Sequence, residues 1–395
     1  MKDKTYILLT VGIGLLLITS SAYTQEMQWL QYHSEREADR IIGNMPSKDL
    51  RLTSERPPNV ELPDFQCEEP LFASWSTPMV KSGQLLVALD RTTESERRDQ
   101  LYIDSNINGH LNDEKPVKAH RTDRYYAYFG PVKVVFEGED GPLAYHLNFR
   151  FYENNNRLRL DAYSGCWYEG DITVGGIKKH CMLIDYNGNG TFNDKSMSYN
   201  QCDRIRVGKK GDVDTRFVGN YIEIDDELYH TEIARDGAFI ILSKADDVKF
   251  GDVQVPETIT EFTAGGENGQ FTFKPEKGAG SLPVGRYRIN SWTIARKDDK
   301  GRRWEVEGRA YTPEGDFEVT EEKKISLDVG EPLKANIQAS LNSQTQNYEF
   351  SKSLRGRMGE YINLTRGGQT VGDLWKMRAK NKEGTFEKTY PMPDQ

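Results

Sequence analysis

Hydrophobic and polar residues alternate along much of the chain after residue 66 with a period of two, which is typical of half-buried β-strands. In "AYHLNFRFY", residues 144–152, this alternation would place Tyr145, Leu147, Phe149 and Phe151 on one face of a strand. We find no helical period of useful length between residues 66 and 250. The pattern therefore predicts an all-β, antiparallel region over residues 66–250.

Short turn sequences separate the alternating segments. Gly175-Gly176 supply the positive φ angles of a two-residue turn inside "WYEGDITVGGIKKHCMLID". Asp236-Gly237 occupy the corresponding place inside "ARDGAFIIL". Each of these sequences predicts a β-hairpin.

A change of composition at residues 243–260, where charges cluster around a proline, marks a boundary. Beyond it, "LPVGRYRINSWTIAR" and "RRWEVEGRAYT" flank the turn "KDDKG", "ISLDVGEPLKANIQASL" alternates, and "DLWKMRAKNKEGTFEKTY" predicts a last hairpin. About seven short strands in roughly 140 residues fit an antiparallel sandwich. Residues 251–395 thus resemble an immunoglobulin-like or carboxypeptidase-regulatory-like β-sandwich in architecture, without the Cys…Trp…Cys spacing of true immunoglobulin domains.

The first 22 residues have the pattern of a secretory signal peptide. Lys2 and Lys4 precede an apolar run, residues 6–18, and small residues precede a cleavage point that we place after Ala22. The run is shorter than the about 20 apolar residues of a membrane-spanning helix, so we expect no membrane span after cleavage. Retention as an uncleaved anchor is the alternative. The expected location is secreted, periplasmic or at the cell surface.

Residues 23–65 are predicted to be a peripheral arm or linker. "EMQWLQYHSEREADRII", residues 26–42, suits a polar helix. The prolines of "SERPPNVELPDF" would break that helix before residue 66.

The chain is acidic, with a formal net charge of −9. Proteins that bind nucleic acid carry clustered Lys and Arg, so nucleic acid is not an expected partner. An acidic surface suits solubility and attracts calcium.

Four cysteines, Cys67, Cys166, Cys181 and Cys202, follow the signal segment. In an oxidising compartment an even number favours two disulfides, and four cysteines allow three pairings. Because the segments around Cys181 and Cys202 are expected to form a hairpin, we predict the pairs Cys181–Cys202 and Cys67–Cys166. Zinc is the weaker alternative, since the adjacent His180 and Cys181 would point to opposite faces of a strand.

Two loops share one sequence pattern. "IDSNINGHLND", residues 103–113, and "IDYNGNGTFND", residues 184–194, are identical at 7 of 11 positions at a constant offset of 81 residues. Counted from the first Asp, both place side-chain oxygens at positions 1, 3, 5, 9 and 10 and a glycine at position 6. A duplicated pattern indicates a shared structural role.

Short oxygen-bearing side chains at alternate positions of a curled loop are the ligands that Ca²⁺ prefers. The pattern predicts calcium as a cofactor, and the candidate ligands are Asp185, Asn187, Asn189, the Thr191 carbonyl, Asn193 and Asp194 in the second loop, and Asp104, Asn106, Asn108, the His110 carbonyl, Asn112 and Asp113 in the first. Glu114 adds a carboxylate directly after the first loop. The alternative is that the Asn-Gly pairs make tight turns in which the carboxylates cap backbone amides.

Over about ten residues each, these DxNxNG loops resemble the DxDxDG calcium loops of EF-hands, dockerins and thrombospondin type 3 repeats. Position 12, where an EF-hand has a bidentate glutamate, holds Lys115 and Ser196, and strands rather than helices are expected to precede the loops. Only two formal negative charges remain in the second loop. The resemblance therefore implies weak binding, on the order of 10⁻⁴–10⁻³ M.

Catalytic motifs such as GxSxG, HExxH, a Walker loop or GxGxxG after a strand do not occur. The whole-chain pattern resembles uncharacterised secreted proteins of environmental bacteria, in which a β-region with paired loops precedes a sandwich. That resemblance implies an exported, non-enzymatic binding or structural protein, with an envelope or extracellular polymer or protein as its partner. The alternative is a secreted hydrolase acting on polysaccharide or peptide.

Overall fold

The computed structural model describes residues 26–391, except 44–45, 94, 96, 139–140, 155–156, 344–345, 372–375, 381–382, 384 and 386. The predicted signal peptide lies outside the described residues. Within them the protein is almost entirely β, and the strand pairings are antiparallel apart from one. The predicted all-β fold class is confirmed.

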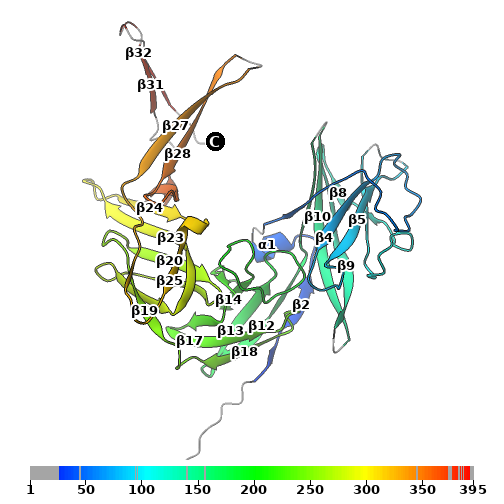
Figure 1. Ribbon diagram of the computed structural model, residues 1–395, viewed down its shortest axis with the longest axis horizontal. Helices are drawn as coiled ribbons and strands as arrows, with labels where there is room; N and C mark the ends of the chain where they lie inside the picture. Colours follow the sequence, from blue (N-terminus) through cyan, green and yellow to red (C-terminus); the bar gives the residue numbers. More distant parts are fainter. Residues whose placement is uncertain are drawn as a thin grey trace, which may run out of the picture.

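Four sheets build the first part of the molecule (Figure 1). One sheet contains β4 (Leu71–Ser76), β5 (Gln84–Asp90), β6 (Gln100–Ile103) and β7 (Val117–Lys118). The next has the order β3 (Lys48–Leu50), β11 (Arg157–Ser164), β10 (Gly141–Asn154), β9 (Tyr126–Gly138) and β8 (Arg121–Thr122). The third has the order β15 (Arg216–Phe217), β14 (Arg204–Gly208), β13 (Ile177–Ile184), β12 (Cys166–Val174) and β2 (Gln31–Ser34), and the fourth the order β1 (Gln28–Trp29), β18 (Phe239–Lys244), β17 (Glu227–Ile233) and β16 (Tyr221–Ile224).

Two further sheets follow, drawn from yellow-green to orange in Figure 1. A three-stranded sheet contains β22 (Ala279–Pro283), β19 (Phe250–Gln254) and β26 (Ile325–Ser326), the last in parallel with β19. A nine-stranded sheet runs through β21 (Gly269–Phe273), β20 (Glu261–Gly266), β23 (Gly285–Lys297), β24 (Arg303–Arg309), β29 (Tyr361–Arg366), β28 (Tyr348–Arg355) and β27 (Lys334–Leu341), with β25 (Asp316–Val319) on β23 and β30 (Gln369–Thr370) on β29. A 3₁₀ turn η1 (Pro313–Gly315) precedes β25, and β31 (Lys376–Lys380) pairs with β32 (Glu387–Pro391).

The alternation along β10 produces the core as predicted. Tyr145, Leu147, Phe149 and Phe151 are at most 2 % exposed and belong to a core cluster that extends from Leu30 to Ile240. A second cluster begins at Val253 and ends at Val329. Hydrophobic burial therefore has two large centres along the chain and two smaller clusters beside them.

Both predicted hairpin turns are present. Gly175 and Gly176 join β12 to β13 with φ angles of 56° and 79°. Gly237, with a φ of 85°, lies between β17 and β18. Glycine reaches these left-handed angles without the steric penalty that other residues incur.

The segment predicted as a peripheral arm is extended, yet it supplies an edge strand to three sheets. β1 pairs with β18, β2 with β12, and β3 with β11. The predicted helix over residues 26–42 is reduced to α1 (Ala38–Ile42), because the residues before it satisfy their backbone groups in sheet ladders instead. Ala38 and Ile42 of α1 are buried against the third sheet.

The alternating segment at residues 334–341 forms β27, but none of its side chains is buried. β27 and β28 make a ribbon that projects from the nine-stranded sheet (Figure 1). The immunoglobulin-like sandwich stays a prediction, since the described residues after 250 form a three-stranded and a nine-stranded sheet with this projecting ribbon.

The cysteine predictions require correction, because Cys67, Cys166, Cys181 and Cys202 are all free thiols. The hairpin around the second loop exists, but Cys181 of β13 lies opposite Val207 of β14. Cys202 is five residues from Val207 along the chain, or about 17 Å in an extended strand. A disulfide needs Cα atoms within about 7 Å, so Cys181 and Cys202 cannot pair. Cys166 contacts the His146 carbonyl through its sulfur (3.6 Å) and is not joined to Cys67.

Burial of α1 predicts unequal effects of two adjacent substitutions. Ile42 is 3 % exposed and Ile41 is 38 % exposed. Ile42→Ala should lower the free energy of unfolding by about 2–5 kcal/mol, because it removes buried methyl groups and leaves a cavity. Ile41→Ala, the matched control, should change it by less than about 1 kcal/mol. Urea unfolding measures both; equal effects would show that the arm does not dock as described.

Candidate functional site

The second loop, residues 185–194, is organised around the carboxylate of Asp185, which follows β13 and is fully buried. Its oxygens accept hydrogen bonds from the backbone N–H groups of Gly188 (2.7 Å) and Gly190 (2.7 Å) and from the Tyr145 hydroxyl (2.7 Å). Trp75 of β4 donates its indole N–H to the carbonyl of Gly188 (2.8 Å). Side chains from two other sheets thus hold the first half of this loop.

Asp194, at position 10, is the second centre of the loop. Its Oδ2 atom accepts hydrogen bonds from the side-chain amides of Asn187 (2.8 Å) and Asn189 (2.7 Å) and from the Thr191 hydroxyl (2.8 Å). Positions 3, 5 and 7 therefore turn inward toward position 10.

A third carboxylate, Asp203, joins the loop from the chain just before β14. It accepts the N–H groups of Tyr186 (3.0 Å) and Asp194 (2.8 Å) and is itself fully buried. Sequence reasoning missed this residue. The sequence marks Asp203 only as an acidic residue immediately before the strand "RIRV", in a chain with many acidic residues.

The first loop, residues 104–113, repeats this arrangement. Asp104 accepts the N–H groups of Asn108 (3.0 Å) and Gly109 (3.0 Å). Asp113 Oδ2 accepts the side-chain amides of Asn106 (2.9 Å) and Asn108 (2.8 Å). The duplicated sequence pattern therefore corresponds to a duplicated three-dimensional arrangement.

The backbones of the two loops also follow the same path. Positions 4 and 6 have positive φ in both: 64° and 98° at Gly188 and Gly190, and 63° and 83° at Ile107 and Gly109. A β-branched residue rarely adopts this conformation. The network around Asp104 therefore holds Ile107 in a backbone geometry that its own side chain disfavours.

Glu114 takes the part in the first loop that Asp203 takes in the second. Its Oε1 accepts the N–H of Ser105 (2.6 Å), at the same loop position as Tyr186, and its Oε2 accepts the Ser105 hydroxyl (2.8 Å). Each loop thus combines three carboxylates, of which two belong to the repeated pattern. The third is Glu114, directly after the first loop, or Asp203, just before β14, for the second loop.

Some of the predicted ligands point away from the loop centres. The Asn193 amide donates to the Ile233 carbonyl (3.3 Å), and the Asn112 amide to the Glu61 carboxylate (2.7 Å). His110 accepts the N–H of Glu61 through Nδ1 (2.9 Å). Position 9 and the His110 side chain therefore anchor the loops to neighbouring segments.

The buried carboxylates have perturbed pKa values. Burial raises the pKa of Asp185 from 3.8 to about 6, although the hydrogen bonds from Tyr145 and the loop amides oppose this shift. Burial, together with the charges of Asp185 and Asp194, raises the pKa of Asp203 well above 3.8. Burial also raises the pKa of Asp104. Asp185 and Asp203 of the second loop thus place negative charge where water cannot screen it, whereas Asp113 of the first loop is exposed.

The donor set of the second loop suits a hard cation. Three carboxylates surround it, and the buried Oδ1 of Asn187 accepts no hydrogen bond from the described residues. Rotation of the Asn187 and Asn189 amides would direct their oxygens, rather than N–H groups, toward Asp194. Among the described residues, no group of three or more His, Cys, Asp or Glu side chains already has a metal-binding arrangement. Binding would therefore need the carboxylates to move closer together as well as this rotation of the amides.

An open cleft of about 620 Å³ reaches the second loop, and Asn187 and Asn189 lie in its wall. Lys48 also lines it and donates to the Ser76 carbonyl (3.0 Å). Burial lowers the pKa of Lys48, and the charge of Asp185 opposes this effect. A cation entering from solvent would meet the side-chain amides of Asn187 and Asn189 first. It would then compete with the Lys48 ammonium group for electrostatic attraction to the Asp185 carboxylate.

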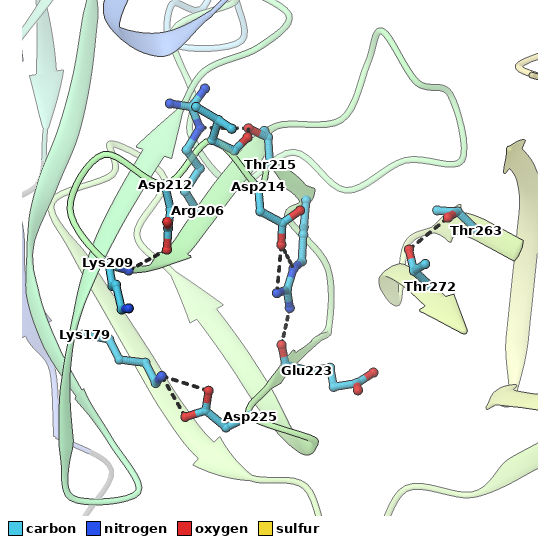
Figure 2. A network of polar contacts seen from close by, with 12 residues as sticks. Lys179, Arg206, Lys209, Asp212, Asp214, Thr215, Glu223, Asp225, Thr263 and Thr272 are labelled. Atoms are coloured by element: carbon cyan, nitrogen blue, oxygen red, sulfur yellow. Dashed lines mark hydrogen bonds and ion pairs between the residues drawn. The ribbon is translucent and has the colours of Figure 1, made fainter. Parts of the chain in front are cut away.

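The opposite end of β13 and β14 carries a separate set of polar contacts (Figure 2). Lys179 pairs with Asp225 (2.7 Å), and Asp212 accepts the N–H of Lys209 (2.7 Å). These contacts are largely exposed, and surface ion pairs of this kind contribute about 0–1 kcal/mol each. The Asp212 contact closes a turn, the Lys179 contact joins β13 to the turn between β16 and β17, and the contacts do not converge on a common centre.

No protein-family model, curated protein or solved structure matches the chain. Within the described residues, no helix has the length and apolar character that crossing a membrane requires.

The raised pKa of Asp185 predicts a pH-dependent stability in calcium-free buffer. Because its pKa is about 6 in the folded protein and 3.8 ordinarily, the folded form binds the proton more tightly. This stabilising contribution is complete below pH about 4 and is lost as the pH rises through about 6, a loss of roughly 3 kcal/mol. The free energy of unfolding of the parent, minus that of Asp185→Asn, should fall accordingly between pH 4 and 7. A difference that stays constant in urea titrations would contradict this assignment.

Proposed function

We propose that the protein is a non-enzymatic, exported binding or structural protein whose two DxNxNG loops are stabilised by calcium. The observation that carries this proposal is the repetition of one carboxylate-centred loop with the same internal hydrogen bonds. In each copy, positions 3 and 5 turn toward the carboxylate at position 10. A plain β-turn requires no such carboxylate.

Charge neutralisation supplies the driving force. Asp185 and Asp203 are fully buried, and burial raises the pKa values of both carboxyl groups. A calcium ion would replace the proton that these groups otherwise hold at low pH. With few formal charges per loop, the expected dissociation constant is on the order of 10⁻⁴–10⁻³ M. A tenfold excess of calcium would then stabilise each loop by about 1.4 kcal/mol.

The surroundings of the second loop favour a structural role for the ion. Asp203 is followed by Arg204, whose guanidinium lies 3.9 Å from the ring centre of Tyr186 and 4.6 Å from that of Tyr199. Tyr199 in turn contacts Tyr311, beyond β24, with 4.4 Å between ring centres. An ion that fixes this loop would also fix a contact between the two core regions.

Export is supported by the basic, apolar and small-residue pattern of residues 1–22. Extracellular calcium is in the millimolar range where weak loops fill. The hydrolase alternative has less support, because the clustered carboxylates accept backbone N–H groups inside the loops.

A thermal melt of the protein in EDTA and in 10 mM calcium tests the proposal. Calcium should raise the Tm of the parent by about 2–5 °C. Asp194→Asn and Asp113→Asn should each remove part of this rise, and the double variant should remove all of it.

Asp212→Asn is the matched control, because Asp212 also caps a backbone N–H (2.7 Å) but lies outside both loops. It should keep the full calcium effect. The proposal fails if the parent does not respond, or if the double variant responds as the parent does.

A further inference from the structure

The outer face of the sheet β3-β11-β10-β9-β8 carries tyrosine and arginine. In one row across the sheet, Arg121 of β8 lies beside Tyr128 of β9, which lies beside Arg150 of β10. The opposite face of the same strands is the buried core, with Phe129, Phe149 and Ala162. This arrangement supplies aromatic rings and guanidinium groups on a face that the core does not use.

Near α1 this face deepens into a cleft of about 350 Å³, which we name the arginine–tyrosine cleft. Its wall includes Arg36, Arg40, Arg121, Arg150, Tyr128 and Tyr163. The cleft is separate from both repeated loops, since none of the loop residues lies in its wall.

Positive charge in the cleft is only partly compensated. Arg40 pairs with Glu37 (2.5 Å) and Arg150 with Asp161 (2.9 Å). In the described part of the chain, no carboxylate forms an ion pair with Arg36 or Arg121. The pKa of His120, which also lines the cleft, is lowered by burial and then by the charges of Arg36 and Arg121.

Tyrosine rings orient two of these guanidinium groups, those of Arg121 and Arg150. The Arg121 guanidinium lies 3.8 Å from the centre of the Tyr128 ring, and that of Arg150 lies 5.8 Å from the centre of the Tyr126 ring. Contact with a ring face leaves the N–H groups at the edge of a guanidinium free to donate in its plane. Such a fork matches the two oxygens of a carboxylate or sulfate.

We propose that the arginine–tyrosine cleft binds an acidic sugar unit of a polysaccharide. Arg36 and Arg121 would bind its carboxylate or sulfate, and the rings would contact the sugar. Glu37 and Asp39 line the same cleft and would accept hydrogen bonds from sugar hydroxyls. These two acids disfavour a densely charged nucleic acid, which has few hydroxyl donors and which the net charge of −9 also repels.

This inference rests on the binding role proposed above and names its ligand class. It does not rest on calcium, because the cleft contains none of the loop residues. The binding experiment is therefore done in EDTA. If calcium does not change the Tm, the sugar-binding result is unaffected. If no acidic sugar binds, the effect of calcium on the Tm is unaffected.

Fluorescence anisotropy with labelled oligogalacturonate, dextran sulfate and uncharged dextran tests the proposal. Binding of oligogalacturonate alone identifies a carboxylate ligand, and binding of dextran sulfate alone a sulfate ligand; either result supports the proposal. The Arg36→Gln/Arg121→Gln double variant should bind the acidic probe at least about tenfold more weakly, because two charge-assisted hydrogen-bond donors are lost.

Arg296→Gln is the matched control. Arg296 lies on β23, outside the sheet that carries the cleft. Its side chain is 53 % exposed and pairs with Glu331. It should bind as the parent does, and all variants should share the parent Tm. The proposal is overturned if neither acidic probe binds, if uncharged dextran binds equally well, if the double variant keeps full affinity, or if single-stranded DNA binds more tightly than both acidic sugars.

Discussion

The buried carboxylate of Asp185 is the contact on which much of the first part of the molecule depends. It directs the backbone of its own loop through Gly188 and Gly190 and receives the Tyr145 hydroxyl from β10. Tyr145 stacks on Trp75 of β4, with 5.7 Å between ring centres, and Trp75 donates back to the loop. Strands from three sheets therefore meet at one charged group, which has been removed from water.

Burying a charge in this way is unfavourable unless it is compensated. The protein compensates it partly with backbone N–H groups and partly with a raised pKa. The same solution is found at Asp104, whose first loop has a different third carboxylate, Glu114 in place of Asp203. Because two separate segments arrive at the same arrangement, the repeated unit is the complete three-carboxylate loop and not only its turn. We propose a divalent cation as the counter-charge for both copies.

Local sequence information was sufficient for several strands and turns between residues 66 and 250. The alternation at residues 144–152 predicted the buried face of β10, and the Gly-Gly and Asp-Gly pairs predicted two hairpins. Of the side chains that the repeat indicated, those at positions 1, 3, 5 and 10 make hydrogen bonds within their loops, whereas those at position 9 contact neighbouring segments. Contacts that depend on strand register could not be predicted from local sequence. Asp203 reaches the loop only because β14 pairs with β13, and the same register separates Cys181 from Cys202. The edge-strand role of residues 28–50 was hidden as well, since it depends on unpaired sheet edges elsewhere in the chain.

The most direct measurement is a calcium titration followed by the backbone amide resonances of Gly109 and Gly190 in ¹⁵N-labelled protein. Both amides donate to the first aspartate of their loop, so a bound ion must change their environment. The account predicts that both resonances shift and saturate at millimolar calcium, together with the side-chain amides of the loop asparagines. Resonances that stay unchanged up to 10 mM calcium would contradict it and would identify the repeated loops as carboxylate-capped turns.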